Sequence, residues 1–241
     1  MIIEYQLPKR KQPFFNFVKG VLRFFKKKVN YVVLGDPLDT NCLMVANHAN
    51  KMGPMQYELY LPLYKVTWGA HEMLGNYASR RAYLRDILYI KKNGVNPKKA
   101  GFKAWFEAIF SKFFYKGIKV LPTYQDARLL GTVKKSVDAL NDDTGVMIFP
   151  EDSNNGYFDK ATSYFPGFVL VMEKYFKVNG KDVPVRPVYY HKKKRLIVVG
   201  EKFYLQDFKE KGMDKHAIAE FFRLEVNGLY DRIESGEFDK K

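Results

Sequence analysis

Apolar and polar positions along the chain predict strands and helices in turn. Short apolar runs, which are typical of buried strands, occur at residues 41–46, 65–70, 117–121, 145–149, 183–189 and 195–199. Apolar residues at helical spacing indicate helices at residues 54–64, 80–92, 98–116, 129–140 and 163–176, and from residue 214 onward. Strands that alternate with helices favour an α/β domain with a mostly parallel sheet flanked by helices.

Residues 13–29 are predicted to form an amphipathic helix. Phe14, Phe17, Val21 and Phe24 recur at helical spacing, while lysines and arginines fall mainly on the other faces. A helix with aromatic residues on one side and basic residues on the other fits the headgroup layer of a membrane. The alternative is a helix that packs its phenylalanine stripe against the rest of the domain.

The charge of the chain narrows the choice of partners. Lysine and arginine number 41 against 26 acidic residues, which gives a formal net charge of +15. Such a balance favours an anionic membrane surface or nucleic acid. We expect the membrane and not nucleic acid, because the sequence has no RNA- or DNA-binding signature and its aromatic residues follow apolar faces.

The expected domain organisation follows from these patterns. Residues 1–35 are expected to tether the protein, and residues 36–241 to form the α/β domain. The sequence has no apolar run of about 18 residues that would span a bilayer, so we expect a peripheral location on the cytoplasmic face of the cell membrane. The single cysteine, Cys42, excludes an internal disulfide, and no metal site is expected.

Two polar motifs directly follow predicted strands. Asn47 and His48 come after the strand at residues 41–46, and Glu151 comes after the strand at residues 145–149. In open α/β sheets, ligands bind beyond the carboxyl ends of the strands. A histidine there could accept a proton from a substrate hydroxyl, supported by a nearby carboxylate. Taken singly, each motif is more typical of a structural histidine or of a turn.

The order of the motifs resembles that of the lysophosphatidic acid acyltransferases and related glycerolipid acyltransferases. The family pattern N-H-x-x-x-x-D-P is matched by NHANKMGP at residues 47–54, and F-P-E-G-T-R-S by FPEDSNN at residues 149–155. Three further family segments correspond to AHEML at residues 70–74, which is an approximate match, to GIKVLPT at residues 117–123, and to VPVRPV at residues 183–188, which meets the family pattern V-P-(I/V)-x-P-V. The resemblance covers roughly residues 40–200.

The resemblance implies transfer of a fatty acyl group from a thioester to a hydroxyl of a lysolipid acceptor. Acyl-CoA or an acyl-carrier protein would be the co-substrate, and no cofactor is implied. His48 would be the general base, with Asn47 and Glu151 as further catalytic residues. Substrate-binding residues would be Lys51, Arg128, Pro150, Asp152, Ser153 and Arg186.

The aspartate that orients the catalytic histidine in the family is replaced by Gly53. Loss of an orienting carboxylate can lower a rate by orders of magnitude. Either Glu151, Glu58 or Asp152 takes over this role, or the protein is a catalytically inactive lipid-binding or regulatory member of the same fold.

Two arginines of the family pattern are also missing. Thr123 and Asn154 stand at their positions, and Asp152 replaces a glycine. With fewer cations and one more carboxylate, we expect a less anionic acceptor than a glycerol phosphate monoester.

Overall fold

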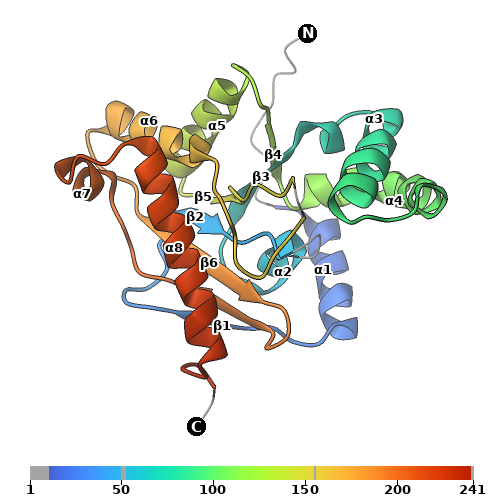
Figure 1. Ribbon diagram of the computed structural model, residues 1–241, viewed down its shortest axis with the longest axis horizontal. Helices are drawn as coiled ribbons and strands as arrows, with labels where there is room; N and C mark the ends of the chain where they lie inside the picture. The colour runs from blue at the N-terminus through green and yellow to red at the C-terminus, as the bar shows by residue number, and fades with distance from the viewer. Residues whose placement is uncertain (1–10, 50–52, 155, 240–241) are drawn as a thin grey trace.

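A sheet with the strand order β1-β7-β6-β2-β5-β3-β4 forms the centre of the structure, a computed structural model that describes residues 11–49, 53–154 and 156–239 (Figure 1). The strands are β1 (Asn30–Val33), β2 (Leu43–Ala46), β3 (Lys65–Ala70), β4 (Val120–Thr123), β5 (Gly145–Ile148), β6 (Val185–His191) and β7 (Leu196–Val199). Within the described residues, β6 and β7 are the one antiparallel pair of neighbours. The predicted α/β architecture with a mostly parallel sheet is therefore confirmed.

Helices cover both faces of the sheet and extend beyond one of its edges. They are α1 (Pro13–Phe25), α2 (Gly53–Tyr60), η2 (His71–Leu74), α3 (Tyr77–Ala82), the π-helical η3 (Tyr83–Lys92), α4 (Pro97–Gly117), α5 (Leu129–Asn141), η4 (Pro166–Phe168), α6 (Val169–Asn179), α7 (Leu205–Glu210) and α8 (Lys215–Glu234). Figure 1 shows α5 to α8 on one side of the molecule, and α1, α3 and α4 on the opposite side. Among the described residues, no helix is both long and apolar enough to cross a membrane.

Alternating side chains of the central strands fill two cores. Leu43 and Val45 of β2 belong to the core under α5, α6 and α7, whereas Met44 and Ala46 face the core that contains Tyr57 of α2. All four β2 residues are buried, as expected for a central strand of a parallel sheet that is covered on both faces. The continuous apolar run of this strand thus holds the following residues, Asn47 and His48, at a fixed place.

Helix α1 is held by one buried phenylalanine and by polar contacts of its basic residues. Phe15 is buried and lies so close to Gly117 that a side chain at position 117 would overlap its ring. The Arg23 Nε atom donates a hydrogen bond of 2.7 Å to the Leu59 carbonyl oxygen, and Lys19 reaches the buried Glu58. The stripe of Phe14, Phe17, Val21 and Phe24 is exposed, whereas Phe15 beside it packs on the domain.

A cluster of three lysines around Glu58 fixes α1 to the sheet. The Glu58 Oε1 atom lies 2.9 Å from Lys19 Nζ and 3.0 Å from Lys119 Nζ, and the Oε2 atom lies 3.8 Å from Lys65 Nζ. Burial alone would raise the pKa of Glu58, but the three ammonium groups outweigh it and lower that pKa. Burial lowers the pKa of Lys65 to about 8, against the opposing effect of Glu58.

The predicted element boundaries differ from the structure where helix and strand meet. The strand expected at residues 117–121 begins at Val120, because α4 continues to Gly117 and Lys119 turns the chain with a φ of 56°. The helix expected at residues 13–29 ends at Phe25. Neither β1 nor α7 was predicted.

Candidate active site

His48 and Glu151 lie side by side at the carboxyl ends of two neighbouring parallel strands. His48 follows β2, and Glu151 follows β5, which pairs with β2 in parallel register. The backbone N–H of His48 donates a hydrogen bond of 3.0 Å to Glu151 Oε1. The structure thus brings together the two strand ends that sequence reasoning singled out.

The imidazole of His48 is positioned by aromatic rings. It stacks on Tyr157, with ring centroids 4.8 Å apart and an interplanar angle of 24°. It also meets Phe149 edge to face, with centroids 5.1 Å apart. Because the hydrogen bond from His48 to Glu151 starts at the backbone, the carboxylate fixes the position of the loop, while these rings fix the plane of the imidazole.

Asn47 joins two strands and does not line the cavity. Its Oδ1 atom accepts hydrogen bonds from the Tyr57 hydroxyl at 2.6 Å and the Tyr190 N–H at 2.8 Å, and its Nδ2 atom donates to the Tyr190 carbonyl oxygen at 3.2 Å. The side chain is almost fully buried. Asn47 therefore positions His48 by clamping the ends of β2 and β6 together, in place of the catalytic role expected for it.

The position of the missing aspartate has no room for a side chain. A Cβ atom at Gly53 would overlap the carbonyl oxygen of His48, so a residue other than glycine there requires a different backbone. The substitute acids expected for this role are placed differently. Glu58 is bound by lysines, and Asp152 Oδ1 accepts hydrogen bonds from the backbone and side chain of Asn154. Glu151 contacts His48, through the backbone N–H.

Lys92, at the end of η3, enters the site beside Ser153. Its Nζ atom donates a hydrogen bond of 2.6 Å to Ser153 Oγ and lies 5.5 Å from the centre of the Tyr157 ring. Sequence reasoning did not include Lys92 or Tyr157 in the site. The only signal for Lys92 was a lysine pair at the end of a predicted helix, which is more typical of a solvated face.

Burial changes the proton affinities of this cluster. Burial raises the pKa of the Glu151 carboxyl to about 7, although the His48 N–H and the Lys92 ammonium act in the opposite direction. Burial lowers the pKa of Lys92, and Asp152 and Glu151 partly offset this effect. Burial also raises the pKa of Tyr157 to about 12. The Glu151 carboxyl can therefore gain or lose a proton near neutral pH.

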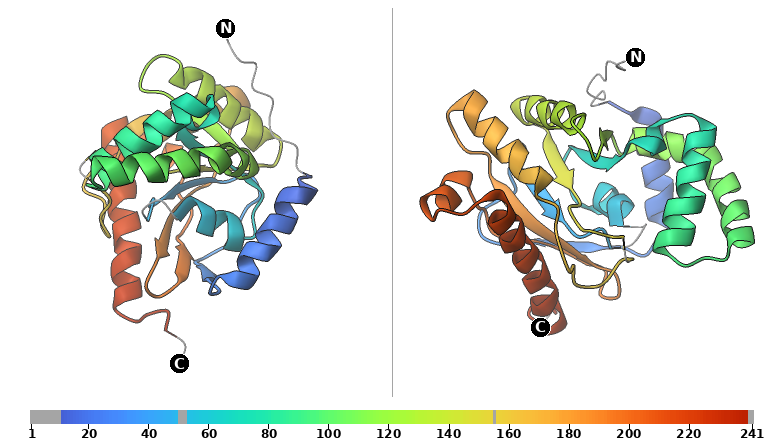
Figure 2. Two further views of the ribbon diagram at one scale, coloured as in Figure 1. Left: turned by 90° about the vertical axis from the view of Figure 1, so that its right-hand side faces the viewer. Right: turned by 45° about the horizontal axis from the view of Figure 1, so that its top comes forward.

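His48 lines a cavity of about 490 Å³, here called the His48 cavity. Its walls come from α1, the start of α2, β3, η3, α4 and β4, and its volume lies within the range of about 300–1,000 Å³ typical of small-molecule sites. The walls are mainly apolar, with Phe106, Phe110 and Phe114 of α4 and Leu22 of α1 among them. The left view of Figure 2 shows α1 and α4 on the same side of the molecule.

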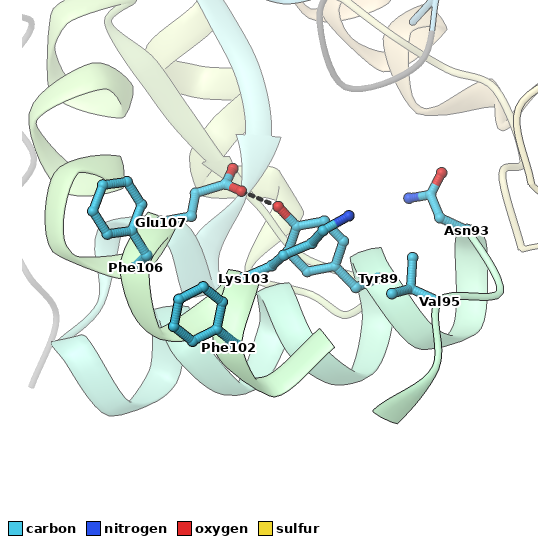
Figure 3. Close-up of a pocket in the computed structure, with 7 residues that line it drawn as sticks. All are labelled: Tyr89, Asn93, Val95, Phe102, Lys103, Phe106 and Glu107. Carbon is cyan, nitrogen blue, oxygen red and sulfur yellow. Dashed lines mark hydrogen bonds between the residues drawn. The ribbon is translucent and has the colours of Figure 1, made fainter. Parts of the chain in front are cut away.

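A second hollow, here called the outer groove, lies between η3 and α4 and has a volume of about 670 Å³ (Figure 3). Its lining consists of Tyr89, Asn93, Val95, Phe102, Lys103, Phe106 and Glu107. Phe106 and Glu107 also line the His48 cavity, so the two spaces adjoin at these side chains.

The other residues expected to bind substrate are placed as follows. Arg186 is fully buried, donates hydrogen bonds to the carbonyl oxygens of four residues and lies 3.8 Å from Asp39, which gives it a structural role in place of the expected anion contact. Arg128 is exposed and binds Asp126 through its guanidinium group, at 2.7 Å. Lys51 lies outside the described residues.

The motif after β5 pairs with the segment that precedes η4, through an antiparallel bridge between Glu151 and Tyr164. The carbonyl oxygen of Pro150 accepts a hydrogen bond of 2.8 Å from the Phe165 N–H, and the Asp152 N–H donates one of 3.1 Å to the Ser163 carbonyl oxygen. These bonds hold Ser153 next to Lys92. Of the expected substrate-binding residues, Ser153 thus has the closest connection to the His48 cluster within the described part of the chain.

The described residues contain no group of three or more histidine, cysteine, aspartate or glutamate side chains that could hold a metal ion. The chain matches no known protein-family profile, no curated protein and no solved structure.

Proposed function

We propose that this protein is a membrane-peripheral acyltransferase that moves a fatty acyl group from a thioester donor to a hydroxyl of a lysolipid. The observation that carries the proposal is the position of His48, which stands at the end of a buried strand beside Glu151 and lines a mainly apolar cavity of about 490 Å³. An apolar cavity suits a fatty acyl chain, and a histidine at its wall suits proton transfer at the head of that chain.

In the proposed reaction, the acyl chain occupies the His48 cavity with its thioester carbonyl near the imidazole. The imidazole takes the proton of the acceptor hydroxyl as the hydroxyl oxygen attacks the carbonyl carbon. The carbon–sulfur bond then breaks, and the departing thiolate receives the proton from the imidazolium. The products are an ester and a free thiol, and no covalent acyl-enzyme is required.

Lys92 is the cation we assign to the acceptor side of the site. It is half-buried next to Ser153, and the carboxylates of Glu151 and Asp152 offset part of its charge. A partly compensated lysine is a weaker phosphate ligand than an arginine, such as those in the pattern of the family that the motifs resemble. This arrangement favours a lysolipid with less negative charge than a phosphate monoester.

Exposed large apolar side chains, most of them aromatic, support the membrane location. Phe14, Phe17, Phe24 and Phe25 of α1 are exposed, and so are Phe102, Trp105, Phe106, Ile109 and Phe110 of α4. The protein has a formal net charge of +15, so an anionic bilayer would attract it. The cytoplasmic face of the cell membrane is the surface that we propose.

A catalytically inactive lipid-binding protein of the same fold is the second candidate. It is favoured by the geometry at Gly53, where a side chain would overlap the His48 carbonyl oxygen, and by the contact of Glu151 with the backbone of His48. In that case the His48 cavity would hold a lipid, and no ester would form.

The test is acyl transfer to a panel of lysolipids from several thioester donors, followed by mass spectrometry. We expect the wild type to form product and His48→Ala to lose at least about a hundredfold in rate, the lower end for a positioned general base. His216→Ala is the matched control, because His216 is exposed on α8, and it should retain full activity. No product from any pair, or equal rates for the wild type and His48→Ala, would favour the inactive lipid-binding protein.

A further inference from the structure

The His48 cavity and the outer groove are separated by a wall that two side chains of α4 provide. Phe106 and Glu107 are lining residues of both spaces. Along α4, the residues that line the His48 cavity begin at this pair and continue through Phe110 and Phe114. The wall therefore lies where the α4 side of the cavity ends, toward the start of the helix.

A hydrogen bond ties this wall to the neighbouring helix. The Tyr89 hydroxyl of η3 donates to Glu107 Oε2, and Figure 3 shows the two side chains joined. On the groove side, Lys103 Nζ lies 5.7 Å from the centre of the Tyr89 ring. The contact links η3 and α4 and places polar groups at the end of an otherwise mainly apolar lining.

We infer that this wall, formed by Phe106 and Glu107 and tied to η3 by the Tyr89 hydrogen bond, limits the length of the apolar chain that the His48 cavity accepts. The inference rests on the proposed function, because it takes a fatty acyl chain as the occupant of that cavity. Each methylene group that enters the apolar part of the cavity raises the affinity by about fourfold. A chain that reaches the wall meets the Glu107 carboxylate, which already accepts the hydrogen bond from Tyr89, so further methylenes add no affinity.

The groove beyond the wall is itself suited to an apolar chain. Val95, Phe102 and Phe106 line it, and Phe102 and Phe106 are spaced four residues apart on α4, so they lie on one face of that helix. Shortening the side chain at position 107 would join the two spaces. Longer chains would then extend from the His48 cavity into the groove.

The experiment measures binding of saturated fatty acids, from decanoic to eicosanoic acid, by displacement of a fluorescent fatty acid from the full-length protein. For the wild type we expect the affinity to rise with chain length and then to level off. In Glu107→Ala, levelling should occur at a longer chain, with a gain of about fourfold for each further methylene. Tyr89→Phe, which keeps the ring but loses the hydroxyl, should shift in the same direction by less.

Two variants serve as controls. Glu107→Gln keeps the length of the side chain and an oxygen that can accept the Tyr89 hydrogen bond. Its affinity should therefore stop rising at the same chain length as that of the wild type. Phe102→Ala changes the outer groove alone, so it should also leave the wild-type limit unchanged. Thermal melting of each variant checks that it is folded. If Glu107→Ala does not fold, Tyr89→Phe is used in its place.

The possible outcomes separate the inference from the proposed function. The affinity of the wild type, of Glu107→Ala and of Tyr89→Phe could stop rising at the same chain length. In that case the wall does not set the limit, but the His48 cavity still binds an acyl chain. If no fatty acid displaces the probe, the cavity does not hold an acyl chain, and both the wall and the proposed function are overturned. A shift in Glu107→Ala that is absent in Glu107→Gln supports the wall.

Discussion

Glu151 is a carboxyl group on which burial and its neighbours act in opposite directions. Burial raises its pKa, whereas the His48 N–H and the Lys92 ammonium lower it, and the result is a pKa of about 7. The same carboxylate holds the backbone of His48 in place. A change in its protonation therefore alters the contact that positions the proposed catalytic base.

Substitution of Glu151 by glutamine should change how stability depends on pH. The pKa is about 7 in the folded protein and near 4.5 in the unfolded chain, so between these values the folded state binds more protons. The free energy of unfolding therefore falls as the pH rises through this window. We expect the wild type to lose stability relative to Glu151→Gln between about pH 5 and about pH 7 in denaturant titrations. A difference between the two proteins that stays constant with pH would contradict the raised pKa.

Among single residues, the positions of some could be predicted from the sequence and those of others could not. The position of His48 beside Glu151 was predictable, because both follow apolar runs that form neighbouring strands. The contribution of Lys92 was not, since it depends on how η3 folds back toward Ser153, a residue 61 positions further along the chain. Arg186 lies within a predicted strand, and nothing in its sequence context showed that carbonyl oxygens of the loop before β2 would surround its guanidinium group.

At the scale of elements, α1 joins the sheet through a buried carboxylate that holds three lysines. Lys19 comes from α1, Lys65 from β3, and Lys119 from the turn before β4. One carboxylate thus connects three elements that are distant in sequence. Removing its charge would leave buried ammonium groups without their counter-charge, which is costly in a protein interior.

Glu58→Gln should therefore lower the free energy of unfolding by about 3–5 kcal/mol, the usual cost of breaking a buried ion pair. The matched control is Glu173→Gln, which removes the partner of Lys209 in an ion pair whose side chains are 38% and 40% exposed. An exposed pair contributes at most about 1 kcal/mol. Chemical denaturation of both variants checks the difference, and a Glu58 variant as stable as the Glu173 variant would show that the cluster does not hold α1.

Helices and strands were predictable where a clear pattern of apolar residues occurs within a short stretch of the chain. The strand at residues 65–70 was expected at its observed bounds. β1 was missed because it has only four residues and directly follows residues 13–29, which were expected to be helical, so its short apolar run did not stand out as a separate element. Its pairing with β7 depends on a contact between the two ends of the domain, which local patterns do not encode.

At the scale of the whole molecule, many of the exposed aromatic residues belong to α1 and α4. These two helices lie on the same side of the molecule (Figure 2). Both helices also line the His48 cavity. The apolar surface and the wall of the proposed site therefore belong to the same two helices. A bilayer in contact with this side would lie next to the cavity that we assign to the acyl chain.

Replacing Phe14, Phe17, Val21 and Phe24 together by serine should release the protein from anionic vesicles in co-sedimentation. These four side chains are between 41% and 83% exposed, so their loss removes apolar contact with lipid and little packing within the domain. The control replaces Leu130, Val178 and Leu224 by serine, since these exposed residues lie on α5, α6 and α8. Unchanged sedimentation of the α1 variant would overturn the proposed tether.

The pairing of β1 with β7 has a consequence for the way the chain folds during its synthesis. A ribosome makes β1 early and β7 late, and β7 is the one neighbour of β1 among the described strands. At about 5–20 residues per second, the interval between them is on the order of ten seconds. β1 therefore has no partner strand until β7 has been made, and during this interval a chaperone can bind the segment that contains β1 and the exposed phenylalanines of α1.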